Sequence, residues 1–346
     1  MKIAVYTIAL NEEQFVERWY NSAKDADYLL IADTGSTDLT VKYAKNYGIN
    51  VINIGIKPWR FDDARNAALA ALPLDIDYCI ALDMDEILLP GWKKEIESLD
   101  PEVTRPRYEY TWSWNDDKSP GLVYGGDKIH SRRSYRWKHP VHEVLVCQDR
   151  EIQSWTKLQI HHYPDQSKSR GQYFPLLELA VREDPYDDRN AFYYARELYF
   201  NNLLQLAARE FKRHLELPKA TWKPERAASM KYLAKCEPEK AQYWLAKAIE
   251  EAPGHREALY EMSLYLQRNK FWEQSIYYAE LALKIKDKPL EYLCEAEAWG
   301  WGPYDAIAVA SFYLGKKEQA LEQGKIALEL NPNDQRLKKN LEFYLN

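Results

Sequence analysis

The stretch YLLIADTGSTD, residues 28–38, joins a short apolar run to a polar turn that contains a glycine. A bounded apolar run of this length is typical of a buried strand, and Ser, Thr and Asp after a glycine favour a turn that starts a helix. The same order recurs on both sides of this stretch. We expect strands at residues 3–10, 28–33, 50–54 and 78–83, and helices at residues 12–23, 39–47 and 62–72. This alternation predicts a mostly parallel sheet with helices on both faces, where ligands bind beyond the carboxyl ends of the strands.

Residues 101–165 lose the helical period, and Trp, Tyr, Arg, Gly and Pro crowd there with strand-like pieces at 141–147 and 155–162. We interpret this region as an antiparallel extension with binding loops that completes a first domain, residues 1–175. The predicted class of this domain is α/β with a Rossmann-like mixed sheet.

Beyond residue 187 only helical patterns are evident, and small residues recur in register. They are Ala207, Ala241, Ser275 and Ala320, followed seven residues later by His214, Ala248, Ala282 and Ala327. The first two spacings are 34 residues, the tetratricopeptide period, and the third is lengthened to 45 by an insertion around residues 288–303. We therefore predict a second domain, residues 187–346, that is an all-α tetratricopeptide-like solenoid. It binds the acceptor or a partner protein, or it only buttresses the first domain.

Composition narrows the classes of function. A length of 346 residues fits two domains. With 47 Lys and Arg against 53 Asp and Glu, the net charge of −6 offers no general footprint for nucleic acid. Four scattered cysteines without a C-x-x-C pair fit a reducing compartment. No apolar run approaches the roughly 20 residues of a transmembrane segment, so we expect a soluble, cytoplasmic protein.

Polar residues at two expected strand ends suggest a site. Asp83 and Asp85 lie two residues apart, so in an extended segment both carboxylates point to one side. Mg²⁺ or Mn²⁺ uses one or two protein carboxylates when substrate phosphates supply its other ligands, although a solvated acidic turn would look the same. Capping alone could explain the Ser, Thr and Asp of residues 36–38, whereas Asp33 stands where a ring N–H or a sugar hydroxyl would find an acceptor.

Four motifs in this order resemble the inverting glycosyltransferases of family 2, which have the GT-A fold. They are TIALNE at residues 7–12, DTGSTD at 33–38, FDDARN at 61–66 and DMD at 83–85. The resemblance covers roughly residues 1–175, and the coupling to tetratricopeptide-like helices is similar to a bacterial and phage subgroup. It implies that Asp33 meets the uracil of a UDP-sugar and that Arg65 reaches the diphosphate or the sugar. The donor-site residues that we assign are Thr7, Ala9, Asn11, Glu12, Asp33, Gly35, Ser36, Arg65, Asp83, Met84, Asp85, Lys168 and Arg170.

Residues 137–143, WKHPVHE, resemble the W-x-x-x-V-H-E segment of that subgroup, although many relatives carry Glu-Asp there. An inverting transfer needs one carboxylate to remove the proton of the acceptor, and we assign Glu143 as this base. The alternative is a surface Glu143 paired with Arg132 or Arg133. His142 could orient Glu143, contact the acceptor or simply pack. Next in line as the base are Asp116, Asp117 and Asp127.

A late strand ends in His161, His162 and Tyr163. Its alternation places Leu158, Ile160 and His162 on one face, and in related enzymes a His at this place completes the metal site. We therefore expect Mn²⁺ or Mg²⁺ to be bound by Asp85, His162 and Asp83, with His161 in reserve. The polar segment 165–171 is of lid type, and its Lys168 or Arg170 could close on the diphosphate.

Together these features predict a metal-dependent inverting transferase that moves a hexose, of the glucose or N-acetylhexosamine type, from a UDP-sugar. The acceptor is left open among protein, peptide, glycan and other small molecules. One alternative is a tetratricopeptide adaptor with a degenerate transferase domain. The other is a sugar nucleotidyltransferase, whose Gly-rich basic loop should follow the first strand, where Asn11, Glu12 and Glu13 stand.

Overall fold

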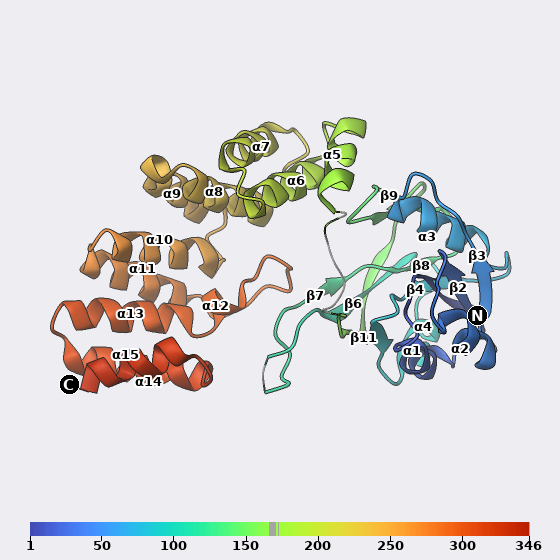
Figure 1. Cartoon of the computed structure of the whole chain (residues 1–346), viewed down its shortest axis with the longest axis horizontal. Coiled ribbons are helices and arrows are strands. Elements are labelled where there is room, and N and C mark those ends of the chain that lie inside the picture. Colours follow the sequence, from blue (N-terminus) through green and yellow to red (C-terminus); the bar gives the residue numbers. More distant parts are fainter. Residues whose placement is uncertain (116, 166–170, 172, 346) are drawn as a thin grey trace. The chain divides into compact units, whose positions relative to one another are not determined.

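A computed structural model describes residues 1–115, 117–165, 171 and 173–345 (Figure 1). The chain divides into two compact units, Met1–Ala180 and Val181–Asn346. Each unit is described by itself below.

The first unit is built on a five-stranded sheet with the order β3-β2-β1-β4-β8. Its strands are β1 (Ile3–Ala9), β2 (Tyr28–Asp33), β3 (Asn50–Asn53), β4 (Tyr78–Ala81) and β8 (Ile129–Ser131). The first four pair in parallel, as the alternation predicts, and β8 pairs antiparallel with β4. The carboxyl ends of β1, β2 and β4 therefore lie at one edge of the sheet.

Both faces of this sheet are covered, because successive side chains of each strand point to opposite sides. Ile3 and Val5 of β1 join one core with α1 (Val16–Ala23), α2 (Thr40–Asn46) and α4 (Trp92–Glu97). Ala4 and Tyr6 join the other core with α3 (Phe61–Ala70), and there Trp137 and Leu145 also pack. The predicted helix at 12–23 begins only at Val16, because the backbone N–H groups of residues 11–13 donate to side chains of residues 36–40.

Residues 86–162 add two smaller sheets. A four-stranded sheet has the order β5-β11-β6-β7, and a hairpin pairs β9 with β10. The bounds are β5 (Glu86–Leu88), β6 (Arg105–Thr111), β7 (Val123–Gly126), β9 (Tyr135–Lys138), β10 (Val144–Cys147) and β11 (Gln153–His162). The expected antiparallel extension is only partly antiparallel, since β11 pairs in parallel with β6. Strand β10 begins three residues later than expected, because His139 and His142 adopt positive φ and bend the chain.

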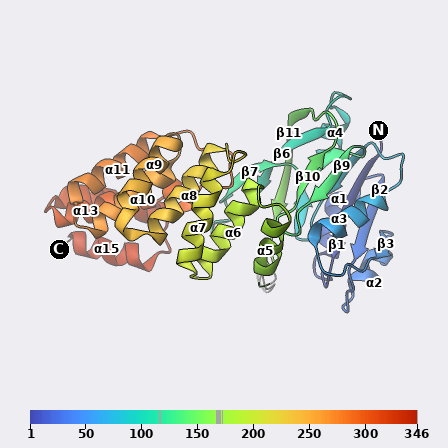
Figure 2. The same cartoon turned by 90° about the horizontal axis from the view of Figure 1, so that it is seen from above.

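The helical part begins before residue 187, with α5 (Tyr173–Glu183). This helix buries Leu176, Leu177 and Ala180. Unit 2 then stacks helices in pairs (Figure 2). The pairs are α6 (Asp188–Phe200) with α7 (Leu204–Glu216), α8 (Lys223–Cys236) with α9 (Ala241–Glu251), α10 (Arg256–Arg268) with α11 (Trp272–Lys284), and α13 (Gly302–Tyr313) with α14 (Lys317–Leu330). A short 3₁₀ turn, Pro238–Lys240, precedes α9, and α12 (Ala296–Trp299) and α15 (Gln335–Leu345) complete the described part.

The repeat register holds in three dimensions. Ala207, Ala241, Ser275 and Ala320 all lie buried in the second helix of a pair. Seven residues after Ala207 the register position is occupied by His214, a large residue where the other repeats have Ala. His214 is also fully buried, and its Nδ1 lies 2.8 Å from the Ser229 hydroxyl of the next pair. Small residues at these places let helix pairs approach closely, which is the packing of a tetratricopeptide-like solenoid.

Among the residues that the structure describes, no helix is both long enough and apolar enough to cross a bilayer.

Candidate active site

The polar turns after β1, β2 and β4 meet at the carboxyl edge of the five-stranded sheet. Ala9 is the register partner of Asp33, and Tyr6 is the partner of Ala81, two residues before Asp83. Ligands of open α/β sheets bind at this edge.

The turns after β1 and β2 are joined by hydrogen bonds. The Asn11 amide N–H donates to the Ser36 hydroxyl at 2.9 Å, and the Asn11 side-chain oxygen accepts from the Thr37 N–H at 2.8 Å. The Glu13 carboxylate in turn accepts from the Leu39 N–H at 2.7 Å. The hydrogen bonds of Asn11 and Ser36 thus hold the turns after β1 and β2 together.

Asp33 is only 3% exposed at the end of β2. Its carboxylate accepts from the N–H groups of Gly35 and Ser36, both at 3.1 Å, and Gly35 adopts a φ of +117° that favours glycine. Asp33 therefore organises its own turn, a role that the capping interpretation had not given it. A carboxylate has about four acceptor positions, so a further donor can still be accommodated.

Arg65 links the acidic turn after β4 to the candidate base. Its Nη2 lies 2.8 Å from Asp83 Oδ1, its Nε donates to Glu143 Oε1, and its guanidinium lies over the Trp137 ring. Burial alone would raise the pKa of Asp83, but Arg65 and Lys128 together hold that pKa well below its usual value. The alternative pairing of Glu143 with Arg132 or Arg133 is wrong, because Glu143 pairs with Arg65.

The next residue of the same helix explains how Arg65 is positioned. The Asn66 side chain donates to the Trp137 carbonyl at 2.9 Å and accepts from the Trp137 N–H at 2.8 Å. This two-way bond fastens α3 to β9, and thereby sets Arg65 opposite the segment that carries Glu143.

Lys128 is a site residue that sequence reasoning missed. Its ammonium lies 2.6 Å from Asp83 Oδ2 and 2.9 Å from Glu86 Oε1. Glu86 is buried, and it also accepts from the Tyr110 hydroxyl at 2.6 Å and from the Asp83 N–H at 2.9 Å. Lys128 follows two glycines between short strands, where no local pattern marks its distance from Asp83. Its position depends on the pairing of β8 with β4.

Asp85 points away from this network and faces His162 at the end of β11. Asp85 Oδ2 lies 3.2 Å from His162 Nε2, and His162 Nδ1 lies 2.9 Å from the Trp112 carbonyl oxygen. The Trp112 ring stacks on the imidazole with centroids 4.4 Å apart. Burial lowers the pKa of His162, but Asp85 outweighs this effect and raises the pKa above its ordinary value.

Arg18 of α1 is a second residue that sequence reasoning missed. Its guanidinium lies over the rings of Phe15 and Tyr163, at 4.9 and 5.0 Å from their centroids. Burial lowers the pKa of Arg18, and the nearby Asp85 carboxylate opposes this shift. Its Nε and Nη2 atoms are buried without a hydrogen-bond acceptor in the described part of the chain. The structure therefore holds a cation with free donors beside Asp85.

The remaining predicted site residues differ in how far they are buried. The side chains of Thr7 and Met84 are buried in the fold, as is Ala9, so any contact they make with a ligand uses little of their surface. Glu12 lies in the turn after β1, where its N–H donates to the Thr40 hydroxyl at 2.7 Å. His142 packs edge-on against the Tyr173 ring. Lys168, Arg170 and Asp116 lie outside the described residues.

The aromatic side chains around the site differ in burial and in their contacts. Tyr108 and Trp137 belong to the buried core. Trp114 stacks on Tyr163 with ring planes 6° apart, and its indole N–H donates to the His162 carbonyl at 2.9 Å. Trp112 and Trp114 therefore fix the end of β11, next to Asp85 and Arg18.

Comparison with known proteins identifies what the chain is similar to. Residues 4–113 match the family model "Glycosyl transferase family 2". The N-terminal part of the chain carries a glycosyltransferase family 2 domain. An uncharacterized glycosyltransferase of Rickettsia bellii is 32% identical over 108 residues, which are 31% of this chain and 35% of that protein. The chain thus spans about a third of the length of such relatives.

Further similarities are to a TPR repeat-containing protein and to solved structures. A TPR repeat-containing protein of Synechococcus elongatus is 28% identical over 178 residues, covering 47% of this chain and 42% of that protein. Among solved structures, yeast Tom70 superposes with a TM-score of 0.40 at 15% identity, covering 52% of this chain and 37% of that chain. Pseudomonas aeruginosa pilF gives 0.38 at 14% identity, covering 48% and 70%.

Proposed function

We propose that the family 2 domain transfers a hexose from a UDP-sugar to an acceptor, with inversion at the anomeric carbon and with a divalent cation. The observation that carries this proposal is the pairing of Asp85 with His162 beside the Asp83, Arg65 and Glu143 network. Asp85 and His162 offer ligands for a cation, and Glu143 offers a carboxylate that can remove a proton.

The residues present fit a divalent cation. His162 has its Nδ1 on the Trp112 carbonyl, so the neutral ring keeps Nε2 as the ligand atom directed at Asp85. Histidines that bind metals typically donate their other ring N–H to a carbonyl in this way. The described residues contain no group of three or more His, Cys, Asp and Glu side chains placed to hold a metal. This fits a cation held by Asp85 and His162 whose other ligands are diphosphate oxygens. When bound, it would neutralise charge on the departing UDP.

Asp83 takes a different part in this proposal. Its two carboxylate oxygens are held by Arg65 and Lys128, so Asp83 positions these cations and is a ligand only if they move. Arg65 and Lys128 stand where they can meet oxygens of the diphosphate or the sugar. Arg18 adds donors on the Asp85 side.

Glu143 supplies the base. As the acceptor oxygen or nitrogen forms its bond to the anomeric carbon, the bond from that carbon to the diphosphate oxygen breaks, and its electron pair leaves with UDP. The acceptor proton passes to the Glu143 carboxylate. The ion pair with Arg65 holds this carboxylate in place for the transfer.

A donor screen tests the function. UDP and UDP-hexoses with Mn²⁺ should raise the melting temperature of the chain, whereas GDP- and ADP-sugars at the same concentration should not. A ligand at 100 times its dissociation constant stabilises the folded state by about 2.7 kcal/mol. EDTA should remove most of the shift, and hydrolysis of the stabilising sugar nucleotide should be detectable. Equal shifts for all nucleotides, or none with either Mn²⁺ or Mg²⁺, would contradict the proposal.

Arg18→Met should weaken binding of UDP by roughly 10- to 100-fold, because a hydrogen bond to a charged group contributes roughly 1.5–3 kcal/mol. Methionine keeps the apolar contact with Phe15 and Tyr163. Isothermal calorimetry in Mn²⁺ measures this loss. Arg133→Met, which removes an exposed arginine, is the matched control and should bind as the unmodified chain does. Unchanged affinity of Arg18→Met would show that Arg18 does not contact the diphosphate.

A further inference from the structure

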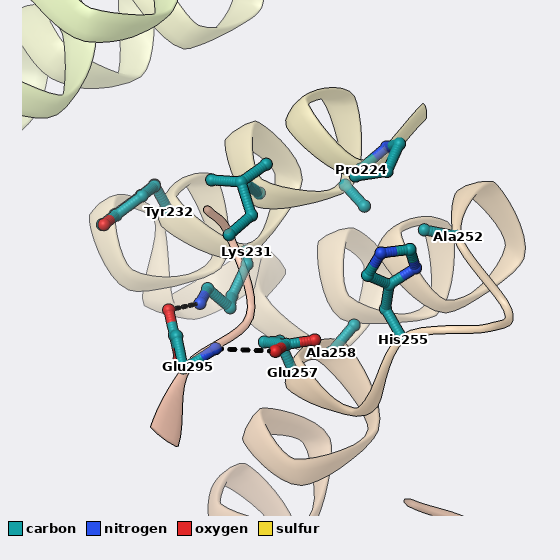
Figure 3. A pocket seen from close by; sticks show the side chains of 11 residues that line it. Pro224, Lys231, Tyr232, Ala252, His255, Glu257, Ala258 and Glu295 are labelled. Carbon is teal, nitrogen blue, oxygen red and sulfur yellow. Dashed lines mark hydrogen bonds and ion pairs between the residues drawn. The ribbon is translucent and has the colours of Figure 1, made fainter. Parts of the chain in front are cut away.

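The insertion that lengthens the third repeat spacing folds back onto earlier helices. Its residues 288–295, here called the insertion segment, contact α6, α8 and the start of α10, which are the first helices of three successive pairs. Residues of the segment close a pocket of about 40 Å³ whose other walls come from α8 and α10 (Figure 3).

Tyr292 makes the central contact of the insertion segment. Its ring stacks on Tyr193 of α6 with centroids 6.1 Å apart and planes 12° apart, and it also contacts Trp222. Its hydroxyl donates to Glu225 of α8 at 2.6 Å. The surface therefore recognises a tyrosine by both its ring and its hydroxyl.

Two glutamates near this tyrosine pair with basic side chains of the solenoid. Glu295 pairs with Lys231 of α8, and Glu291 lies 2.8 Å from His255 Nε2 at the start of α10. The N–H of Glu295 also donates to Glu257 at 2.8 Å (Figure 3). The segment, which turns at residues 291–294, is thus bound through two carboxylates, a tyrosine and one backbone N–H.

The insertion segment satisfies this surface incompletely. Glu257 is 8% exposed, and its Oε2 has no hydrogen-bond donor within the part of the chain that the structure describes. The same holds for His255 Nδ1. An unpartnered buried polar atom costs about 1–3 kcal/mol, so a ligand that donates to Glu257 would bind better than the segment does.

The charge of the surface determines what can replace the segment. The Lys231 side chain is 5% exposed, whereas Glu295 is 49% exposed and is held mainly by polar contacts. If the segment left alone, Lys231 would be a buried cation without its carboxylate, which is unfavourable. A replacement must therefore bring a carboxylate to Lys231.

We propose that the insertion segment is a built-in occupant of a peptide-binding surface on α6, α8 and α10, and that an acidic segment of another protein, with a tyrosine between glutamates, takes its place. Because the built-in segment is tethered, its effective concentration is of the order of millimolar, and it weakens any competing peptide accordingly. The surface is closed until a partner of this chemistry is present at high local concentration. This proposal does not depend on the transferase reaction.

The test uses the full chain and a fluorescent peptide that copies residues 286–297, with serine in place of the cysteine. The double variant Tyr292→Ala, Glu295→Gln weakens the built-in segment and leaves the surface intact. We expect it to bind the peptide at least tenfold more tightly than the unmodified chain does, as measured by fluorescence anisotropy. Adding Lys231→Gln should reverse the gain, and a peptide phosphorylated on tyrosine should bind far more weakly because Glu225 repels the phosphate. Glu318→Gln, which changes an exposed glutamate of α14, should match the unmodified chain.

Hydrogen exchange of the unmodified chain gives an independent test that needs no variant. The Glu295 amide should exchange at least about a hundredfold faster than the amides in the middle of α8 and α10, because the segment leaves while the helices stay folded. The proposal is overturned if this amide exchanges together with the helices. It is also overturned if the folded double variant gains no affinity, or if Lys231→Gln or tyrosine phosphorylation has no effect.

Discussion

Glu143→Gln should lower single-turnover sugar transfer by about 10²–10⁴-fold while UDP-sugar affinity stays within threefold of the unmodified chain. Glutamine keeps the size of the side chain and can still accept from Arg65 Nε, but it cannot take the acceptor proton. A loss of this size equals about 2.7–5.4 kcal/mol in the activation barrier. Rapid-quench measurement of transfer and calorimetry of donor binding on one preparation separate the two effects.

The matched control is Glu109→Gln, which changes a half-buried glutamate that accepts from Gln159 at 2.9 Å. This variant should transfer sugar at the unmodified rate. If Glu143→Gln transfers within threefold of the unmodified chain, the base lies elsewhere. Asp127, which is ion-paired with Arg105, and Asp117 would then be the remaining candidates. Asp117, whose carboxylate accepts only from the nearby Ser119 among the described residues, would be examined first.

Asp85→Ala should weaken UDP binding in Mn²⁺ by about a hundredfold and leave the weak binding in EDTA unchanged. The reason is that the variant removes one of two proposed protein ligands, and even outer partners of metal sites contribute about 10–100-fold in metal affinity. His162→Ala should act in the same direction. Titration of UDP by calorimetry, in Mn²⁺ and in EDTA, measures the ion-dependent part directly.

Asp25→Ala is the control for this experiment, because Asp25 is exposed on the turn after α1. Two results would count against the metal assignment. Equal UDP affinity of the Asp85→Ala variant and the unmodified chain in Mn²⁺ would show that Asp85 is not a ligand. An equal loss in Mn²⁺ and in EDTA would show that the Asp85 carboxylate acts without a cation, for example through Arg18.

The architecture of both units could be predicted from local patterns. Apolar runs bounded by polar turns locate β1, β2, β3 and β4 to within about two residues, because a buried strand must be apolar along its length. The 34-residue spacing located the second helices of the pairs, since a large side chain there would hold neighbouring helices apart. His214 is accommodated only because Ser229 across the interface accepts or donates a hydrogen bond.

The candidate site was predictable in part. Asp33, Asp83 and Asp85 follow strands of the alternating β-α region. Because that alternation predicts parallel strands, their carboxyl ends could be expected at one edge of the sheet. The contact of Arg65 with Glu143 joins residues 78 positions apart and depends on how Asn66 fastens β9. A contact between residues so far apart cannot be predicted from their spacing along the chain.

By itself the sequence determined most elements, the repeat-bearing second region and the acidic strand ends. Each of these follows from residues that are close in the chain or recur at a fixed spacing. Only the tertiary structure decided that Asp83 pairs with Lys128 while Asp85 faces His162, although the two aspartates are two residues apart. It also placed the insertion segment on α6 and α8, which lie 60 or more residues earlier in the chain, as the contact of Tyr292 with Glu225 shows. Such choices depend on which distant charges and rings come within a few ångströms, and that distance is set by packing.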